Sequence, residues 1–501
     1  MVIGVNVRQN IFIMQGCRWL QLHLLLALCL SLTAAAQSPE LPLLRQLRDQ
    51  LVATNGLRDA DVVAIISERA INDTAQRIKG LEIKLANGAV MKINAVAIEL
   101  KPAAAWVKLG VEAEPLGKLK SVNFRLSGKL GSGEINGSHL RLPFQLTDVV
   151  LGAEDSSSSS VLKFLLREWL APEKWNAALP PLEIPLQLSQ ALEIPAATFV
   201  TNGEMPMMMT TPAYQIKTEF WLQSFLALDG RAIIALSLQP TTEPVITVSG
   251  PIDGVDDEAD LIGEITQLTQ HLTTSNDLRV LVRKNAINNL LAKIAAAHAL
   301  DLTAQLQPGR LRTEEIDALL GKILNYTDVE SGAGQADVTS LQIEKISAER
   351  VFMRLSGQGE LMAQVKGREF GIPYHLAPHG KFSLNQELVP LQILSNNDRL
   401  VVRAEAGTYV TVRVSLSIEV AGHSIGLPRT VKLQADQWLK DLELPAIFSQ
   451  TVQLPRKIVI GKNNEMVIVN SETTQYSVTN LRVEMTAEEL EFMADIGSPK
   501  K

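Results

Sequence analysis

Stretches in which apolar and polar residues alternate dominate the sequence beyond its first hundred residues. Every second residue is apolar in 105–113 and 122–126, and the same holds for 140–146 and 410–420. A period of two sustained over several pairs is typical of an antiparallel strand with one buried and one solvated face. The pattern therefore predicts a protein built mainly from long antiparallel β-strands.

Helical periodicity occurs at only a few places. Leucines at 44, 47 and 51 share one face of a predicted helix that ends at Asn55–Gly56. A second predicted helix spans 162–169, with the serine run 156–160 as its polar loop and cap. The acidic, turn-rich stretch 250–260 is the best candidate for a linker. Its carboxylates have no EF-hand spacing, so we expect them to begin a helix rather than to bind calcium.

The chain repeats itself. The segment VVAIISERAINDTAQRI, at 62–78, aligns without gaps on LRVLVRKNAINNLLAKI, at 278–294, and the shared Ala-Ile-Asn falls at 70–72 and 286–288. Each copy is a short β-run followed by an amphipathic helix, and each is followed far downstream by a similar tail, LEIP or LELP. Two copies of one unit, differing by insertions, are therefore expected.

The first 36 residues have the features of a secretory signal peptide. Positive charge precedes an apolar run at 20–32, Ala34–Ala36 offers a cleavage site, and no acidic residue occurs before Glu40. Translation from either Met1 or Met14 would keep this leader. We therefore expect a periplasmic or secreted product whose mature chain begins near residue 37.

Removal of the leader also changes the chemistry that the chain can carry. Both cysteines, Cys17 and Cys29, lie in it, so the mature chain has no disulfide, thiolate metal site or thiol nucleophile. The formal net charge of −7 becomes −9 because the leader carries Arg8 and Arg18. An acidic balance opposes binding to nucleic acid. No later apolar run is long enough to span a membrane, so we expect no integral membrane protein.

At DVVAIISERAINDTAQRIKGLEI the sequence resembles the TULIP lipid-binding superfamily, in particular the group of the bactericidal/permeability-increasing protein and lipid-transfer proteins. The likeness lies in a short β-run, a serine (Ser67), a helix and then a twisted antiparallel sheet. The second copy has the same layout but carries Arg283 in place of the serine. The resemblance implies an elongated pair of β-and-helix barrels, joined by a central sheet, that bind lipid.

The expected fold class is thus α+β, with two tandem copies of a long, twisted antiparallel sheet wrapped on amphipathic helices. The predicted division of the chain is a signal peptide at 1–36, an N-terminal helical segment at 37–56, a first TULIP-like copy at 57–249, an acidic linker at 250–260 and a second TULIP-like copy at 261–501.

The apolar strand faces are the candidate lipid-binding surface. Burial of each methylene contributes about 0.8 kcal/mol, so an acyl chain needs only an apolar seam and no catalytic group. The same alternation also produces an ordinary dry core, and the pattern does not separate the two. The candidate contacts are Val107, Leu109, Val111, Val122, Phe124, Leu126, Val412, Val414, Leu416 and Ile418.

Gly422–Gly426 matches the G-x-S-x-G nucleophile elbow of esterases, with Ser424 as the nucleophile. That motif needs a parallel strand before it, a helix after it and a histidine later in the chain. Here no histidine follows His423, and an alternating stretch follows the serine. The segment 419–428 also aligns on 134–143, which carries no elbow. We therefore predict a hairpin turn and no enzyme.

Metal and cofactor sites receive little support from the sequence. His375 and His379 are separated by Pro378 and lack the glutamate of a zinc-protease helix. His271 and His298 lie in helical segments without neighbouring acidic clusters, so no metal and no cofactor are expected. The predicted function is an exported protein that binds or transfers lipid or another long apolar ligand. The alternatives are a structural protein of the cell envelope with a protein partner and, more remotely, an esterase that uses Ser424.

Overall fold

The computed structural model describes residues 41–497 except for a number of segments. The predicted signal peptide, the predicted helix 162–169 and residues 250–257 of the predicted linker lie outside the described residues. The segments within 41–497 that are left out are 85–87, 89, 103, 115–120, 131–133, 137, 143, 152–181, 204, 241–257, 319–320, 397–398, 421–422, 440–441, 445–449 and 461–465.

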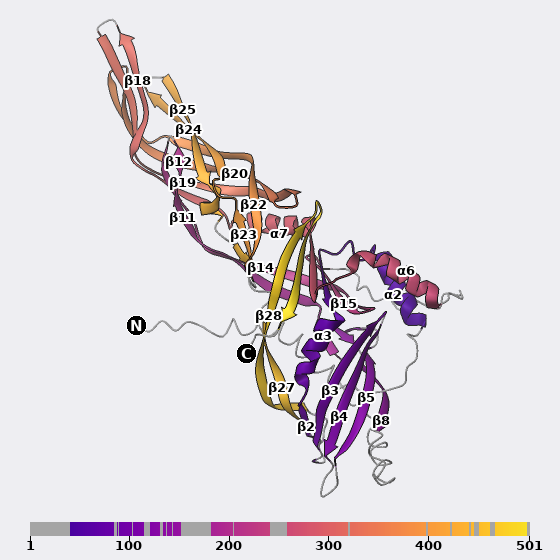
Figure 1. Cartoon of the computed structure of the whole chain (residues 1–501). Helices are drawn as coiled ribbons and strands as arrows, with labels where there is room; N and C mark the ends of the chain where they lie inside the picture. The colour runs from indigo at the N-terminus through magenta and orange to yellow at the C-terminus, as the bar shows by residue number, and fades with distance from the viewer. Residues whose placement is uncertain are drawn as a thin grey trace.

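The protein is elongated, with two β-rich lobes that extend from opposite sides of a central sheet (Figure 1). Almost all described strand pairs are antiparallel, and the helices are few, as an α+β class predicts. The strands of the central sheet, in spatial order, are β10 (Gln187–Ile194), β14 (Tyr214–Leu228), β15 (Arg231–Ser237), β1 (Val62–Ser67), β16 (Leu278–Arg283), β29 (Glu489–Gly497) and β28 (Met466–Met485).

The first lobe continues this sheet. Its strands are β27 (Gln450–Ile460), β2 (Glu82–Lys84), β3 (Val90–Lys101), β4 (Ala104–Glu114), β5 (Val122–Leu130) and β8 (Phe144–Leu151), beside a small sheet of β6 (Glu134–Asn136), β7 (His139–Leu142) and β9 (Leu182–Pro185). The single strand predicted across 140–146 is wrong, because β7 ends at Leu142 and β8 begins at Phe144 in another sheet.

The second lobe is a separate sheet. Its main path is β11 (Ala197–Val200), β13 (Met207–Thr211), β17 (Leu302–Leu306), β19 (Gly321–Ile346), β20 (Val351–Glu369), β22 (His379–Asn396), β24 (Tyr409–Val420), β25 (His423–Gln434) and β12 (Asn202–Gly203). Four strands pair at its sides: β18 (Gly309–Ala318), β21 (Ile372–Leu376), β23 (Arg399–Ala404) and β26 (Leu442–Leu444). Along β24 the side chains alternate between buried and less buried from Val410 to Val420, as the period of two predicts.

The repeat produces a local two-fold arrangement at the centre. β1 pairs antiparallel with β16, and Ala64 lies opposite Val280, its own counterpart in the sequence alignment. The flanking strands follow the same plan, because β15 pairs with β1 as β29 pairs with β16. Even the register shift recurs, between Leu222 and Ser224 in β14 and between Thr479 and Arg482 in β28.

The shared asparagine of the two copies has one structural role. α3 (Glu68–Ala75) follows β1, and α7 (Lys284–Ala296) follows β16. The Asn72 amide donates to the carbonyl of Ile98 at 2.7 Å and accepts from the N–H of Ile98 at 2.7 Å. Asn288 makes the same pair of bonds to Ile343, at 3.4 and 2.5 Å. Each asparagine therefore ties its helix to the long strand that follows, β3 or β19.

Each copy also lends strands to the opposite lobe. β13 belongs to the first copy but pairs with β17 of the second lobe, and β27 of the second copy pairs with β2 of the first lobe. Figure 1 shows β11 and β12 among the orange strands of one lobe and the yellow β27 beside the indigo β2. Strands β11 and β13 of the first copy and β27 of the second thus exchange places between the lobes.

Two helices cover one face of the central sheet. α2 (Leu41–Ala53) forms where the leucine spacing predicts a helix, and it packs against α6 (Glu258–Leu268). Buried Leu44 and Leu51 of α2, Ile265 of α6 and Ile65 of β1 share one core. α6 begins inside the stretch 250–260, so at least residues 258–260 are helical rather than linker.

Candidate functional site: the apolar interior of the second lobe

All ten candidate contacts point into cores. Each has an exposed fraction of 5% or less. Those on β4 and β5 lie in the first lobe and those on β24 in the second, so the structure does not gather them into one site. Residues of a dry core and residues that contact a lipid are both buried, so burial does not separate them. A candidate contact can reach a ligand only where a cavity lies beside it.

One small cavity lies beside this set, in the second lobe. It has a volume of about 20 Å³, and Val412 of β24 is the one candidate contact among the described residues that line it. A cavity needs roughly 10–15 Å³ to hold one water, so this space admits a single small group. A longer ligand would have to enlarge it. The other lining residues are Met209, Leu302, Ala336, Asp337, Val338, Gly357, Gln358, Phe382, Leu384, Leu433 and Trp438.

Trp438 lines this cavity and carries a hydrogen-bond donor that is not used within the described part of the chain. It ends the one-turn helix α8 (Ala435–Trp438), which follows β25, and it is 2% exposed. Its indole Nε1 has no hydrogen-bond partner in the described part of the chain. Burial of an unsatisfied donor costs about 1–3 kcal/mol, and buried tryptophan N–H groups usually find an acceptor. In the sequence this residue is a lone tryptophan between Gln437 and Leu439, and nothing there marks it as part of a site.

Met209 is the one methionine among the described residues that line the cavity, and it continues a run of buried methionines in the same core. Met205, Met207 and Met209 are each at most 1% exposed, and all three belong to the first copy although they pack in the second lobe. Methionine has three rotatable bonds and adapts to irregular spaces. The part of the lining formed by Met209 can therefore change shape more easily than a valine or isoleucine at that position could.

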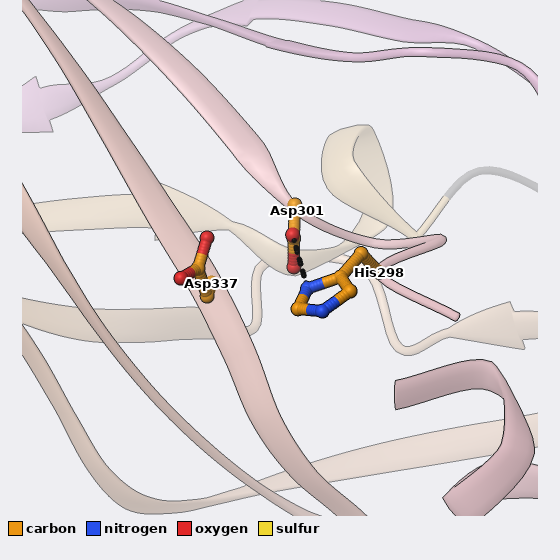
Figure 2. A group of neighbouring side chains, drawn as sticks. All are labelled: His298, Asp301 and Asp337. Carbon is orange, nitrogen blue, oxygen red and sulfur yellow. Dashed lines mark hydrogen bonds and ion pairs between the residues drawn. The ribbon is translucent and has the colours of Figure 1, made fainter. Parts of the chain in front are cut away.

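Polar groups mark the side of the cavity that reaches the surface. Gln358 is exposed and Asp337 is partly exposed. Asp337 belongs to a group with His298 and Asp301, whose ligand-type atoms all lie within 4.8 Å of one another (Figure 2). The expectation that His298 has no acidic neighbours was therefore wrong, because the turn after α7 brings Asp301 to it and β19 brings Asp337.

The His298–Asp301–Asp337 group has a structural explanation. His298 Nδ1 lies 2.8 Å from Asp301 Oδ2, and Asp301 Oδ1 accepts from the Val338 N–H at 2.9 Å (Figure 2). His298 has φ of 57°, a left-handed conformation that histidine adopts more readily than most residues. One nitrogen and two carboxylates are donors that zinc accepts. Because both Asp301 oxygens already accept hydrogen bonds, we interpret the group as a set of contacts that stabilises the turn between α7 and β17.

Ser424 lies in a β-hairpin, as predicted. β24 pairs with β25 up to Val420 and His423, and Ser424 lies opposite Glu419. The Ser424 hydroxyl has the Ser417 hydroxyl as a neighbour, at 3.3 Å. It borders an open groove of about 590 Å³ whose described lining residues include no histidine. The groove is lined by Arg312, Glu369, Phe370, Ser424, Ile425, Gly426, Leu427 and Arg429.

The alignment of 419–428 on 134–143 holds only in part. β6 and β7 also form a hairpin, closed at Asn136 and His139, within one residue of the aligned position. The strands before the two turns do not correspond in the order of their sheets, because β5 is the third strand counted from β3 whereas β24 is the fourth counted from β19. The two turns are alike, but their sheets are not.

No helix among the described residues is long and apolar enough to cross a membrane.

Comparisons with known proteins give little support for an assignment. No protein-family model and no curated protein sequence matches the chain. A solved structure described as the crystal structure of lipopolysaccharide binding protein matches 88% of this chain and 100% of its own, with 11% sequence identity and a TM-score of 0.24. At these values the likeness establishes neither a common fold nor a common ligand.

Proposed function

We propose that the protein is an exported, TULIP-like carrier or sensor of a lipid or another long apolar ligand, which it binds in the second lobe. One observation carries the proposal: a largely apolar cavity beside Val412 whose lining includes the adaptable side chain of Met209 and Trp438, a tryptophan whose indole donor has no partner among the described residues. A core built for stability alone gains nothing from leaving Trp438 unsatisfied.

Binding in this lobe requires the cavity to grow. Each methylene taken from water contributes about 0.8 kcal/mol, so a chain of several carbons offsets the cost of moving a few side chains. Met209 and the short helix α8 are the parts of the wall best able to move. No catalytic group or cofactor takes part.

Displacement of a fluorescent fatty acid, cis-parinaric acid, from the purified mature chain tests the proposal. We expect saturable binding and a lipid in a solvent extract of the protein. Val412→Ile adds one methylene to a cavity of about 20 Å³ and should weaken the binding several-fold without loss of stability. Val414→Ile, on the same face but not lining the cavity, is the matched control. A clean extract together with no saturable binding would exclude the proposal.

The small size of the cavity favours a second candidate, a structural protein of the cell envelope. A cavity this small beside a well-buried core, together with strands that each copy lends to the opposite lobe, is suited to a rigid structural role. In that case the chain would bind no apolar probe and would instead retain one defined envelope protein in a pull-down. An esterase remains the remote alternative, and hydrolysis of a short ester that Ser424→Ala abolishes would establish it.

A further inference from the structure

We propose that the indole N–H of Trp438 is the donor that selects the ligand, and that the ligand is an acyl chain ending in an uncharged carbonyl, such as a fatty ester. This inference rests on the proposed function and goes beyond it by naming the chemical class. It begins with two facts about one residue: Trp438 lines the cavity, and its Nε1 has no partner among the described residues.

The composition of the wall restricts what can accept this hydrogen bond. The described lining residues away from the surface are Met, Leu, Ala, Val, Gly, Phe and Trp, and none of them is a cation. A carboxylate moved into such surroundings loses its hydration without a counter-ion, which is far more costly than the loss suffered by a neutral carbonyl. Asp337 at the surface side adds a negative charge that repels a second one. An ester carbonyl therefore fits, and an ionised fatty acid does not.

A bound water is the competing occupant of the cavity. The volume of about 20 Å³ admits one water, but a buried water usually makes about three hydrogen bonds. Among the lining side chains, Trp438 supplies one donor, and Asp337 and Gln358, on the side that reaches the surface, supply the other polar groups. A ligand carbonyl that accepts the Trp438 hydrogen bond reproduces the bond that the water would make there, so such a group can displace the water.

The test compares three twelve-carbon probes on the mature chain: methyl laurate, laurate and dodecane. We expect methyl laurate to bind about ten-fold more tightly than dodecane, and also more tightly than laurate at pH 7.5. One neutral hydrogen bond to a buried donor has that order of effect. Trp438→Phe should remove the preference for the ester over dodecane. Trp221→Phe, in β14 of the central sheet, should leave it unchanged.

A spectroscopic measurement follows the ligand in the unaltered sequence and uses the variant only to assign one signal. In protein labelled with ¹⁵N-indole tryptophan, the Trp438 N–H signal is identified by its loss in Trp438→Phe. It should move downfield with methyl laurate and not with dodecane. Equal binding of ester and alkane with no movement of this signal would overturn the inference and leave the proposed function standing. Failure of all three probes to bind would overturn both.

Discussion

The two sequence copies are much more alike in the central sheet than in the two lobes. At the centre, strands, register and a β-bulge all recur between the copies. In the lobes, β19 and β20 have 26 and 19 residues, whereas β3 and β4, which follow the equivalent helix, have 12 and 11. The structure of the centre is constrained because β1 pairs with its own counterpart, β16. A substitution in either strand therefore alters a contact of both copies. The lobes pair mainly with themselves and have been free to diverge.

Two equivalent aspartates show both the agreement and the departure. The Asp61 carboxylate accepts from the Leu238 N–H at 2.7 Å, and the Asp277 carboxylate accepts from the Ile496 N–H at 3.1 Å. Their backbone carbonyls accept from Arg283 and from Ser67 in the same mirrored way. Asp277 alone also binds an arginine, through Arg69 Nε at 2.8 Å. Asp277, the aspartate of the second copy, thus makes more contacts between β1 and β16 and their neighbours than Asp61 does.

Asp277→Ala should therefore have the largest effect on stability. Asp277 is 3% exposed, and its loss leaves the Ser67 hydroxyl, the Arg69 guanidinium and the Ile496 N–H without their acceptor. Hydrogen bonds to a charged group contribute about 1.5–3 kcal/mol each, so we expect a loss of about 3 kcal/mol in the free energy of unfolding. Urea denaturation followed by circular dichroism measures it. Asp61→Ala is the comparison: an equal loss there would show that the two aspartates are equivalent, and a larger one would reverse the predicted ranking.

Asn72 and Asn288 make equivalent contacts, and their substitution tests whether these contacts contribute equally to the free energy of unfolding. Asn72→Ala removes two hydrogen bonds to the backbone of Ile98, which lies in a buried position. We expect a loss of about 2 kcal/mol in the free energy of unfolding, because a buried carbonyl and a buried N–H lose their partners. Asn288→Ala should cost somewhat less, since its donor bond to Ile343 is 3.4 Å long. A larger loss for Asn288→Ala would contradict this ranking.

The two copies also differ at the N-cap of the helix that follows β1 or β16, which is Ser67 in the first copy and Arg283 in the second. The Ser67 hydroxyl accepts from the Ala70 N–H at 3.1 Å and caps α3, whereas Arg283 makes no side-chain cap on α7 and pairs with Glu489 instead. Ser67→Ala should cost about 1 kcal/mol in thermal or urea unfolding. Arg283→Ser gains a cap and loses an ion pair, so we expect a change within about 0.5 kcal/mol. A large loss in Arg283→Ser would show that the ion pair, not the cap, holds α7.

The sequence was informative where a feature depends on local pattern or on the repeat. Alternation located β4, β5 and β24, and leucine spacing located α2. The alignment at Asn72 and Asn288 identified equivalent helices before their shared contact was known. The alternating stretch after Ser424 and the alignment with 134–143 predicted the hairpin in which Ser424 lies.

The remaining features depend on contacts between distant segments. The exchange of β13 and β27 between lobes leaves no local trace, because a strand has the same alternation whichever sheet it joins. Asp337 reaches Asp301 and His298 only through the register of β19 with β17. The role proposed for Trp438 depends on its indole N–H having no hydrogen-bond partner among the described residues, and no pattern in the sequence indicates that. Tertiary pairing, rather than propensity, decides each of these.

The smallest expected effect concerns His271, which in the alignment of the copies falls on Asn55 of the first. Burial is the main cause that lowers the pKa of His271 below its ordinary value of 6.5, and Arg58 and Arg283 lower it further. Above pH 6.5 the imidazole is neutral in both the folded and the unfolded chain. As the pH falls below 6.5 the unfolded chain takes up a proton that the folded chain resists, so stability should decrease gradually between pH 6.5 and 5. Thermal unfolding at several pH values should show this slope in the unaltered chain and a shallower one in His271→Asn, which carries the residue of the first copy. An unchanged slope in the variant would mean that the two copies do not differ here in their response to acid.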